Sequence, residues 1–348
     1  MRNAPPEVVE SWPKPNYENP DYQGPQLLIV GVILVTISVI VVALRLWVRL
    51  YMKTTAGWDD WLMVVALVLI ICSTVTSNLG TTYGWGVHIW DIRPEMATPS
   101  LMTSWFNQLQ LIIIMTLVKL SLLISYLRFL TKAIHRKLTW GMIGLTTAWG
   151  IAYMITMFTA CIPLRAYWET LQSDSENCTN KSSATMSFSI TNMVTDLMVL
   201  VVPIPVLWNL KLPMRERLGL IALMSLGLLA CVASGIRIFY TYQTLNVTYD
   251  ITWDGYQIWL WILIEVNLAV MCASIPTLRP LARRYFPRLG FRNSTYRHGR
   301  AAYATHMGSP TSPTGRFSQK TDQQMVHRTD STEALRQDVY PMNSPTSV

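Results

Sequence analysis

The chain has 348 residues, of which 51% are hydrophobic and only 14% are charged. Because a soluble globular domain carries about 25% charged residues, this composition excludes an ordinary soluble fold and favours a chain whose main solvent is lipid. The formal net charge of +8 does not indicate nucleic-acid binding, because the positive residues lie between apolar segments on one side of the predicted membrane.

Seven apolar segments are long enough to cross a bilayer, which takes about 20 apolar residues at a rise of about 1.5 Å each. They predict an all-α membrane protein: an N-terminal segment at 1–26, a seven-transmembrane-helix bundle at 27–290 and a disordered C-terminal tail at 291–348. The tail is too poor in apolar residues to bury a core. In chain order, the predicted spans are 27–48, 61–80, 104–130, 139–161, 186–207, 218–240 and 256–277.

Lysines and arginines gather on one side of the predicted bundle, which indicates the cytosolic side. Three N-glycosylation sequons, at Asn177, Asn180 and Asn246, fall in connections on the other side. We therefore predict a multi-pass glycoprotein of the plasma membrane, with its N-terminus outside and its C-terminus in the cytosol. The cations that decide this orientation are Arg45, Arg49, Lys53, Arg128, Lys132, Arg136, Lys137, Lys211, Arg215, Arg217, Arg279, Arg283, Arg284 and Arg288.

Four ionisable residues lie within the predicted third, fifth, sixth and seventh spans: Lys119, Asp196, Arg237 and Glu265. One charge at the bilayer centre costs about 2.5–3.5 kcal/mol even on a lenient scale. Because two cations and two anions can neutralise one another, we expect all four to face the bundle interior. The expected pairs are Lys119 with Asp196 and Arg237 with Glu265.

Polar neighbours accompany these charges on the fifth and seventh spans. Asn192 and Asn267 are expected to complete the hydrogen bonds of the four charges. Two interpretations stay open for the group: a polar lock that fixes helix packing, and a ligand or proton site inside the membrane.

Charged residues also stand at the ends of the predicted spans. Asp59 and Asp60 open the second span, and we interpret them as helix caps that accept from free backbone N–H groups. Arg128, at the inner end of the third span, is interpreted as a positive-inside anchor. His88 and Asp91 together supply too few ligands for a metal ion, so no metal site is expected.

Two cysteines fall on the predicted outer side, Cys161 and Cys178, with sixteen residues between them. Because this side faces an oxidising compartment, we predict a disulfide that contributes about 3 kcal/mol in the loop-entropy model. The other cysteines, Cys72, Cys231 and Cys272, lie inside spans and are expected to act as small packing residues.

Short motifs occur in a fixed order through the predicted bundle. They are Gly57-Trp58-Asp59-Asp60, Gly84-Trp85-Gly86-Val87-His88, Val118-Lys119-Leu120-Ser121, Cys161-Ile-Pro163, Thr195-Asp196-Leu197, Pro203-Ile-Pro205, Ser234-Gly-Ile-Arg237, Ile264-Glu265-Val266-Asn267 and Pro276-Thr277-Leu278-Arg279-Pro280. Their order and spacing over 27–290 resemble the fungal rhodopsin domain family of seven-helix membrane proteins. The resemblance implies a receptor-like protein, or a membrane protein encoded beside secondary-metabolite genes.

The family name raises the question of retinal, which requires a lysine in the last helix for a Schiff base. The span 256–277 contains no lysine, so no cofactor is expected. The acid-Arg-aromatic triplet of familiar G-protein-coupled receptors is missing, because Arg128 lies between Leu127 and Phe129.

No HExxH, Walker or Gly-x-Ser-x-Gly motif is present in the chain. We interpret the chain as an integral membrane receptor-like or sensory protein of unknown ligand, rather than an enzyme. The expected partners are the lipid bilayer, an extracellular or lipophilic ligand, and a cytosolic signalling partner at the basic loops and tail. The alternatives are a cyclase-like membrane enzyme using Asp196 and Glu265 as acids, and an accessory membrane protein of a secondary-metabolite pathway.

Overall fold

The computed structural model describes residues 5–52, 57–128, 133–169, 178–203 and 214–285. Within these ranges, seven helices are long and apolar enough to cross a membrane. This result confirms the predicted all-α fold with seven spans, whereas the predicted disordered tail at 291–348 and Asn177 lie outside the described residues. The long helices are α2 (Gln26–Trp47), α3 (Trp58–Thr82), α4 (Pro94–Leu127), α5 (Ala133–Thr159), α7 (Lys181–Val201), α9 (Met214–Tyr242) and α10 (Ile251–Tyr285).

The start of α4 and the end of α7 differ from the predicted positions, and each lies at or close to a proline. α4 begins at Pro94 rather than at 104, because proline is tolerated in a first turn, where its missing N–H would have no partner. α7 ends at Val201 rather than at 207, shortly before Pro203. The shorter elements are α1 (Pro6–Glu10), a 3₁₀ turn (Ile89–Asp91), α6 (Ala166–Glu169) and π-helical turns at Val48–Met52 and Gln243–Val247.

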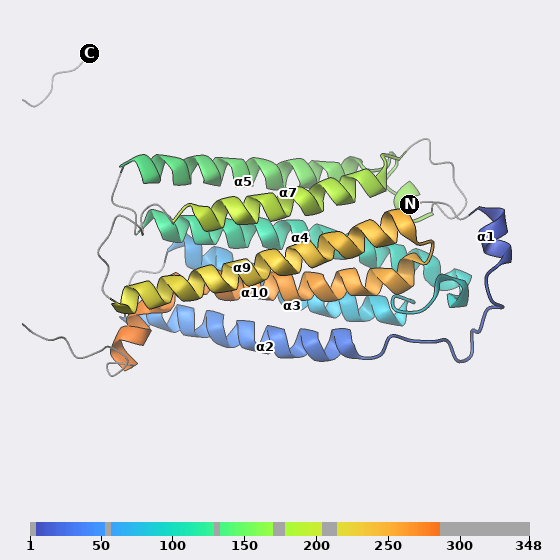
Figure 1. Cartoon of the computed structure of the whole chain (residues 1–348), viewed down its shortest axis with the longest axis horizontal. Helices are drawn as coiled ribbons and strands as arrows, with labels where there is room; N and C mark the ends of the chain where they lie inside the picture. Colours follow the sequence, from blue (N-terminus) through green and yellow to red (C-terminus); the bar gives the residue numbers. More distant parts are fainter. Residues whose placement is uncertain (1–4, 53–56, 129–132, 170–177, 204–213, 286–348) are drawn as a thin grey trace, which may run out of the picture. The chain divides into compact units, whose positions relative to one another are not determined.

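Helices α4 and α10 lie at the centre of the bundle. α4 packs against α3, α5, α7 and α10, and α10 packs against α2, α3, α4 and α9 (Figure 1). Aliphatic side chains from these helices form the core, while α2 and α5 expose apolar side chains, as expected of helices that face lipid. Cys231 and Cys272 are buried as expected, but Cys72 is exposed on α3.

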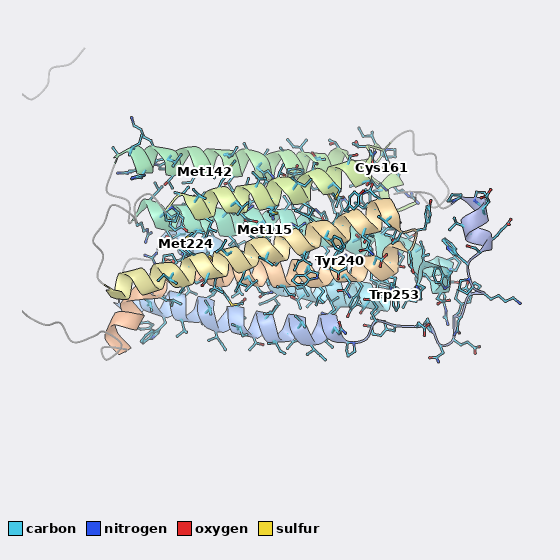
Figure 2. The ribbon with its side chains drawn as sticks, in the orientation of Figure 1. Met115, Met142, Cys161, Met224, Tyr240 and Trp253 are labelled. Atoms are coloured by element: carbon cyan, nitrogen blue, oxygen red, sulfur yellow. A yellow bond between two sulfur atoms is a disulfide. The ribbon has the colours of Figure 1, made fainter. Side chains whose placement is uncertain are left out.

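The predicted disulfide between Cys161 and Cys178 is present and joins the end of α5 to the start of α7. Asn180 follows directly and caps α7, because its side chain accepts from the Ser183 N–H. Asn246 is exposed in the turn after α9, so chain order places both sequon asparagines at the disulfide end of the bundle. Figure 2 shows Cys161 toward that end and Met142 toward the other.

Aromatic side chains close the disulfide end between α2, α3 and α10. The rings of Trp85 and Trp259 stack with centroids 4.4 Å apart. The Tyr256 hydroxyl donates to the Gly24 carbonyl and accepts from the Leu27 N–H, both at 2.9 Å. These bonds fix the entry of the chain into α2 against the first turns of α10.

Gly80 of α3 provides a test of this packing. A Cβ atom at this position would lie 2.1 Å from the Trp259 ring. We expect Gly80→Ala to lower the free energy of unfolding by about 1–3 kcal/mol, because the bulky indole must move. Thermal unfolding of the detergent-solubilised protein measures the effect.

The matched control is Gly144→Ala on the exposed face of α5, where an added Cβ meets nothing within 4 Å. This control should be neutral or stabilising, since alanine favours helix over glycine. Equal stability of the two variants would contradict the packing between α3 and α10.

Candidate functional site

Four charged side chains meet inside the bundle, one from each of four helices. Lys119 comes from α4, Asp196 from α7, Arg237 from α9 and Glu265 from α10. Two ion pairs form, Lys119 Nζ to Asp196 Oδ1 at 3.2 Å and Arg237 Nε to Glu265 Oε2 at 2.5 Å. We call these four residues and Asn192, which bridges them, the inner charge cluster.

Lys119 is surrounded by acceptors. Its side chain is 4% exposed, and the ammonium group donates to the Asn192 side-chain oxygen at 2.9 Å, to the Asn192 carbonyl at 3.2 Å and to the Thr195 hydroxyl at 2.6 Å. The same nitrogen lies 4.8 Å from the centroid of the Trp149 ring. The side chain therefore joins α4 to α5 and α7.

The second pair is a bidentate contact. Arg237 also donates from Nη2 to Glu265 Oε1 at 3.3 Å and from Nη1 to the Ser189 hydroxyl at 2.8 Å. Its guanidinium carbon lies 5.9 Å from the centroid of the Phe188 ring. Two parallel N–H···O bonds fix orientation as well as distance, so this pair sets the packing of α9 against α10.

Asn192 connects the two ion pairs. Its amide group donates to Glu265 Oε1 at 2.7 Å and to Asp196 Oδ2 at 3.1 Å, while its oxygen accepts from Lys119. The cluster balances two positive and two negative charges and satisfies them with internal bonds, which is the condition for burying charge in a membrane protein.

The placement expected for Asn267 is wrong. Its oxygen accepts from the Ser38 hydroxyl of α2 at 2.6 Å, and its amide donates to the Leu263 carbonyl at 2.8 Å. Asn267 stands two residues after Glu265, roughly 200° further around the helix. It therefore faces α2 instead of the inner charge cluster.

A second group of charges lies near the other end of the bundle, and sequence reasoning missed it. Asp59 and Asp60 at the start of α3 were interpreted as caps, but both side chains are buried and paired with arginines. One capping bond does exist, from the Gly57 N–H to Asp60 Oδ2 at 3.1 Å. We call Asp59, Asp60 and the arginines Arg45, Arg49 and Arg128 the end cluster.

Arg45 is the centre of the end cluster and is fully buried. Its guanidinium contacts Asp60 Oδ1 at 2.9 Å and Asp59 Oδ2 at 2.8 Å, and it donates to the Ala273 carbonyl of α10 at 2.8 Å. Arg49 adds a contact to Asp59 Oδ2 at 2.9 Å. These bonds tie α2 to α3 and α10, so Arg45 and Arg49 are more than positive-inside anchors.

Ser121 and Ser125 bring α4 into the same group. The Ser121 hydroxyl donates to the Asp59 carbonyl at 2.7 Å, and the Ser125 hydroxyl donates to Asp59 Oδ2 at 3.0 Å. The signal for this cluster was available in the sequence. Arg45 lies inside the apolar run of the first span, where an unpaired cation is costly, and two acids open the next span.

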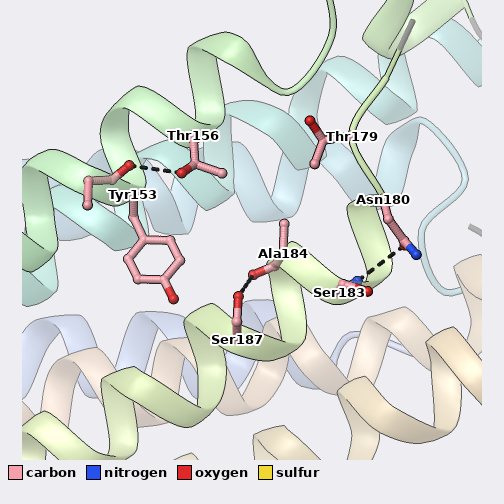
Figure 3. A pocket seen from close by; sticks show the side chains of 8 residues that line it. Tyr153, Thr156, Thr179, Asn180, Ser183, Ala184 and Ser187 are labelled. Atoms are coloured by element: carbon pink, nitrogen blue, oxygen red, sulfur yellow. Dashed lines mark hydrogen bonds between the residues drawn. The ribbon is translucent and has the colours of Figure 1, made fainter. Parts of the chain in front are cut away.

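A pocket opens between α5 and α7 at the disulfide end (Figure 3). Its volume is about 530 Å³, within the range of about 300–1,000 Å³ that is typical of small-molecule sites. Hydroxyl and aliphatic groups line it, and no charged side chain does so among the described residues. The lining includes Ala152, Tyr153, Thr156, Ser183, Ala184 and Ser187.

Three aromatic rings lead from this pocket toward the inner charge cluster. Tyr153 lines the pocket and meets Phe188 edge-on, with centroids 5.2 Å apart. Phe188 stacks on Trp149 at 5.3 Å. The Thr191 hydroxyl lies 3.0 Å from both the Tyr153 hydroxyl and the Trp149 ring nitrogen, which fixes the three rings together. Phe188 contacts Arg237, and Trp149 contacts Lys119.

His88 lies at the disulfide end with a partner other than Asp91. Its Nδ1 atom is 2.5 Å from Asp250 Oδ2, and its ring stacks between Trp90 and Trp253 at 4.6 and 4.0 Å. Among the described residues, no group of three or more His, Cys, Asp or Glu side chains is arranged to hold a metal ion.

Comparison with known proteins adds relatives to this geometry. Receptor GIN3 of Arthrobotrys oligospora is 32% identical over 253 residues, which cover 71% of this chain and 60% of that protein. The polyenoic acids biosynthesis gene cluster protein Ba17b of Metarhizium anisopliae is 24% identical over 288 residues, 76% of each chain. A SAT4 family membrane protein of Emericella nidulans is 25% identical over 66% of this chain and 56% of its own length.

The chain thus spans about three fifths of the length of the receptor relative. No solved structure matches it significantly. The family model described as the fungal rhodopsin domain matches residues 44–284, which contain both charge clusters and the pocket. The chain belongs to the fungal rhodopsin domain family of membrane proteins.

Proposed function

We propose that the chain is a receptor-like sensory protein that binds a small molecule in the pocket between α5 and α7. The observation that carries this proposal is the continuous contact from the pocket to the inner charge cluster. Tyr153 touches the pocket, Phe188 contacts Arg237, and Trp149 contacts Lys119. A ligand that moves the Tyr153 ring changes the surroundings of both cations, and these cations join four helices.

Acid catalysis receives less support from the same geometry. Glu265 accepts from Arg237 and Asn192, and Asp196 accepts from Lys119 and Asn192. Neither carboxylate lines the pocket. A general acid must reach the group that it protonates, so these two residues serve helix coupling better than proton donation to a substrate.

The orientation with the N-terminus outside belongs to this proposal. The disulfide, Asn180 and Asn246 share one end of the bundle, and disulfides persist in oxidising compartments. The opposite end carries most of the lysines and arginines that flank the spans, as cytosolic ends do. The pocket then lies near the outer end of the bundle, and the end cluster lies at its cytosolic end.

A second candidate is an accessory role in a biosynthetic pathway. It is favoured by relatives named for biosynthetic gene clusters, such as the Metarhizium anisopliae protein. Such a role predicts that loss of the gene changes metabolites even when the transcripts of the pathway are unchanged. A sensory role predicts that transcripts change first.

The test is a strain that lacks the gene, complemented with variants of the chain. Ala184→Trp fills the pocket, and Ile155→Trp adds the same ring to an exposed site on α5. Transcriptomes after a change of growth medium should lose the wild-type response with Ala184→Trp and keep it with Ile155→Trp. Equal responses in the two strains, at equal protein levels, would contradict ligand sensing in this pocket.

Substitutions in the inner charge cluster separate a packing role from a signalling role. Lys119→Met should destabilise the protein by about 3 kcal/mol, because it leaves the Asp196 carboxylate unpaired in the bundle. The double variant Lys119→Met with Asp196→Leu should recover most of that loss. Thermal unfolding in detergent measures both effects, with Lys137→Met on the exposed start of α5 as the control.

If stability recovers in the double variant and the transcriptional response does not, the cluster transmits the signal. If both recover, the cluster is a packing element alone, and the proposed coupling is wrong.

Glycosylation tests the orientation. We expect glycan at Asn246, so Asn246→Gln should increase gel mobility, and glycosidase treatment should abolish the difference from wild type. Asn293, in the sequence Asn293-Ser-Thr of the predicted cytosolic tail, is the control. A mobility change with Asn293→Gln, and none with Asn246→Gln, would reverse the proposed orientation.

A further inference from the structure

We propose that Arg128 is a releasable latch that holds the end of α4 to the start of α3. The latch belongs to the end cluster, at the end of the bundle opposite the disulfide and the pocket. Its release frees the last residues of α4, beyond Ser125, from the start of α3, while the rest of the end cluster, including the bonds from Ser121 and Ser125 to Asp59, stays intact. The proposal goes beyond ligand sensing, because it concerns different residues and holds whether or not the pocket binds a ligand.

Charge is the first argument. The end cluster contains three arginines and two aspartates, so it has one positive charge in excess. When Arg128 leaves, Arg45 and Arg49 still balance Asp59 and Asp60. Burying a net charge is costly, so the departure of one cation relieves the excess instead of creating one.

Contacts show which arginine can leave. Arg45 is fully buried and bonded to α3, α4 and α10, so its loss would leave several groups without partners. Arg128 is 34% exposed and pairs through Nη2 with Asp59 Oδ1 at 2.9 Å. Because the Arg128 side chain already reaches solvent, its guanidinium can exchange this ion pair for water, whereas the buried Arg45 cannot.

Asp59 keeps other bonding partners when Arg128 leaves. Its other oxygen, Oδ2, is held by Arg45 at 2.8 Å, by Arg49 at 2.9 Å and by the Ser125 hydroxyl at 3.0 Å. These bonds do not involve Arg128. The carboxylate therefore keeps its position, and its Oδ1 atom can accept from water in the open state.

Gly57 leaves the space that the Arg128 guanidinium occupies when the latch is closed. A Cβ atom at this position would lie 1.6 Å from Arg128 Nη2, 2.6 Å from Asp59 Oδ1 and 2.7 Å from the Arg128 guanidinium carbon. Only a residue without a side chain lets the guanidinium lie against the backbone here. Gly57→Ala therefore displaces the Arg128 guanidinium and crowds Asp59 Oδ1 without changing any charge, whereas Arg128→Gln removes the charge and leaves Gly57 in place.

Hydrogen exchange in the full-length protein, reconstituted in lipid nanodiscs, tests the latch. Both Gly57→Ala and Arg128→Gln should accelerate amide exchange about tenfold in residues 124–127 of α4 and 61–64 of α3. Exchange in the middle of α4 and in α10 should stay unchanged, and the unfolding temperature should remain close to that of wild type. Arg136→Gln, an exposed arginine on α5 at the same end, is the control and should change neither segment.

Two results would overturn the proposal. Unchanged exchange in both segments means that Arg128 does not hold the helix ends together. Faster exchange throughout the bundle, or an unfolding temperature as low as that of Arg45→Gln, means that Arg128 is a structural brace. Agreement between Gly57→Ala and Arg128→Gln is required, since they open the latch by different physical means.

Discussion

The structure depends on one constraint: a charge inside a lipid-surrounded bundle must meet its opposite within the bundle. Lys119 and Arg237 do so with Asp196 and Glu265, and Arg45 and Arg49 do so with Asp59 and Asp60. The arrangement of the helices follows, because each pair joins two different helices. Apolar contacts alone specify less, since lipid tails are as apolar as the side chains of the core.

Two helices, α4 and α10, take part in both clusters. α4 provides Lys119 to the inner charge cluster and Ser125 to the end cluster, and α10 provides Glu265 to the first and the Ala273 carbonyl to the second. Lys119 and Arg128 are nine residues apart on α4, or about 13 Å along its axis. A rotation or shift of α4 at one cluster therefore acts on the other, which gives a physical route from the proposed pocket to the proposed latch.

Sequence reasoning predicted the features that depend on one-dimensional patterns. Span length and hydropathy predicted seven helices, and the cost of buried charge predicted an inward position for Lys119. The direction in which each side chain points around its helix axis was harder to predict. Asn267 is close to Glu265 in sequence, but it faces α2. The end cluster was missed because Asp59 was interpreted as a cap alone, although the cost of a buried charge applied to Arg45 in the first span as it did to Lys119. The pocket and the three aromatic rings join α5 to α7 and leave no pattern in either segment alone.

The central claim is that the inner charge cluster couples the helices through neutralised charge. A double-mutant cycle on Arg237→Met and Glu265→Leu, followed by thermal and chemical unfolding in detergent, tests it most directly. The account predicts that each single variant loses about 3–5 kcal/mol and that the double variant is more stable than either, so that the coupling energy exceeds the loss caused by either substitution alone. Additive effects of the two substitutions, within about 0.5 kcal/mol, would contradict it.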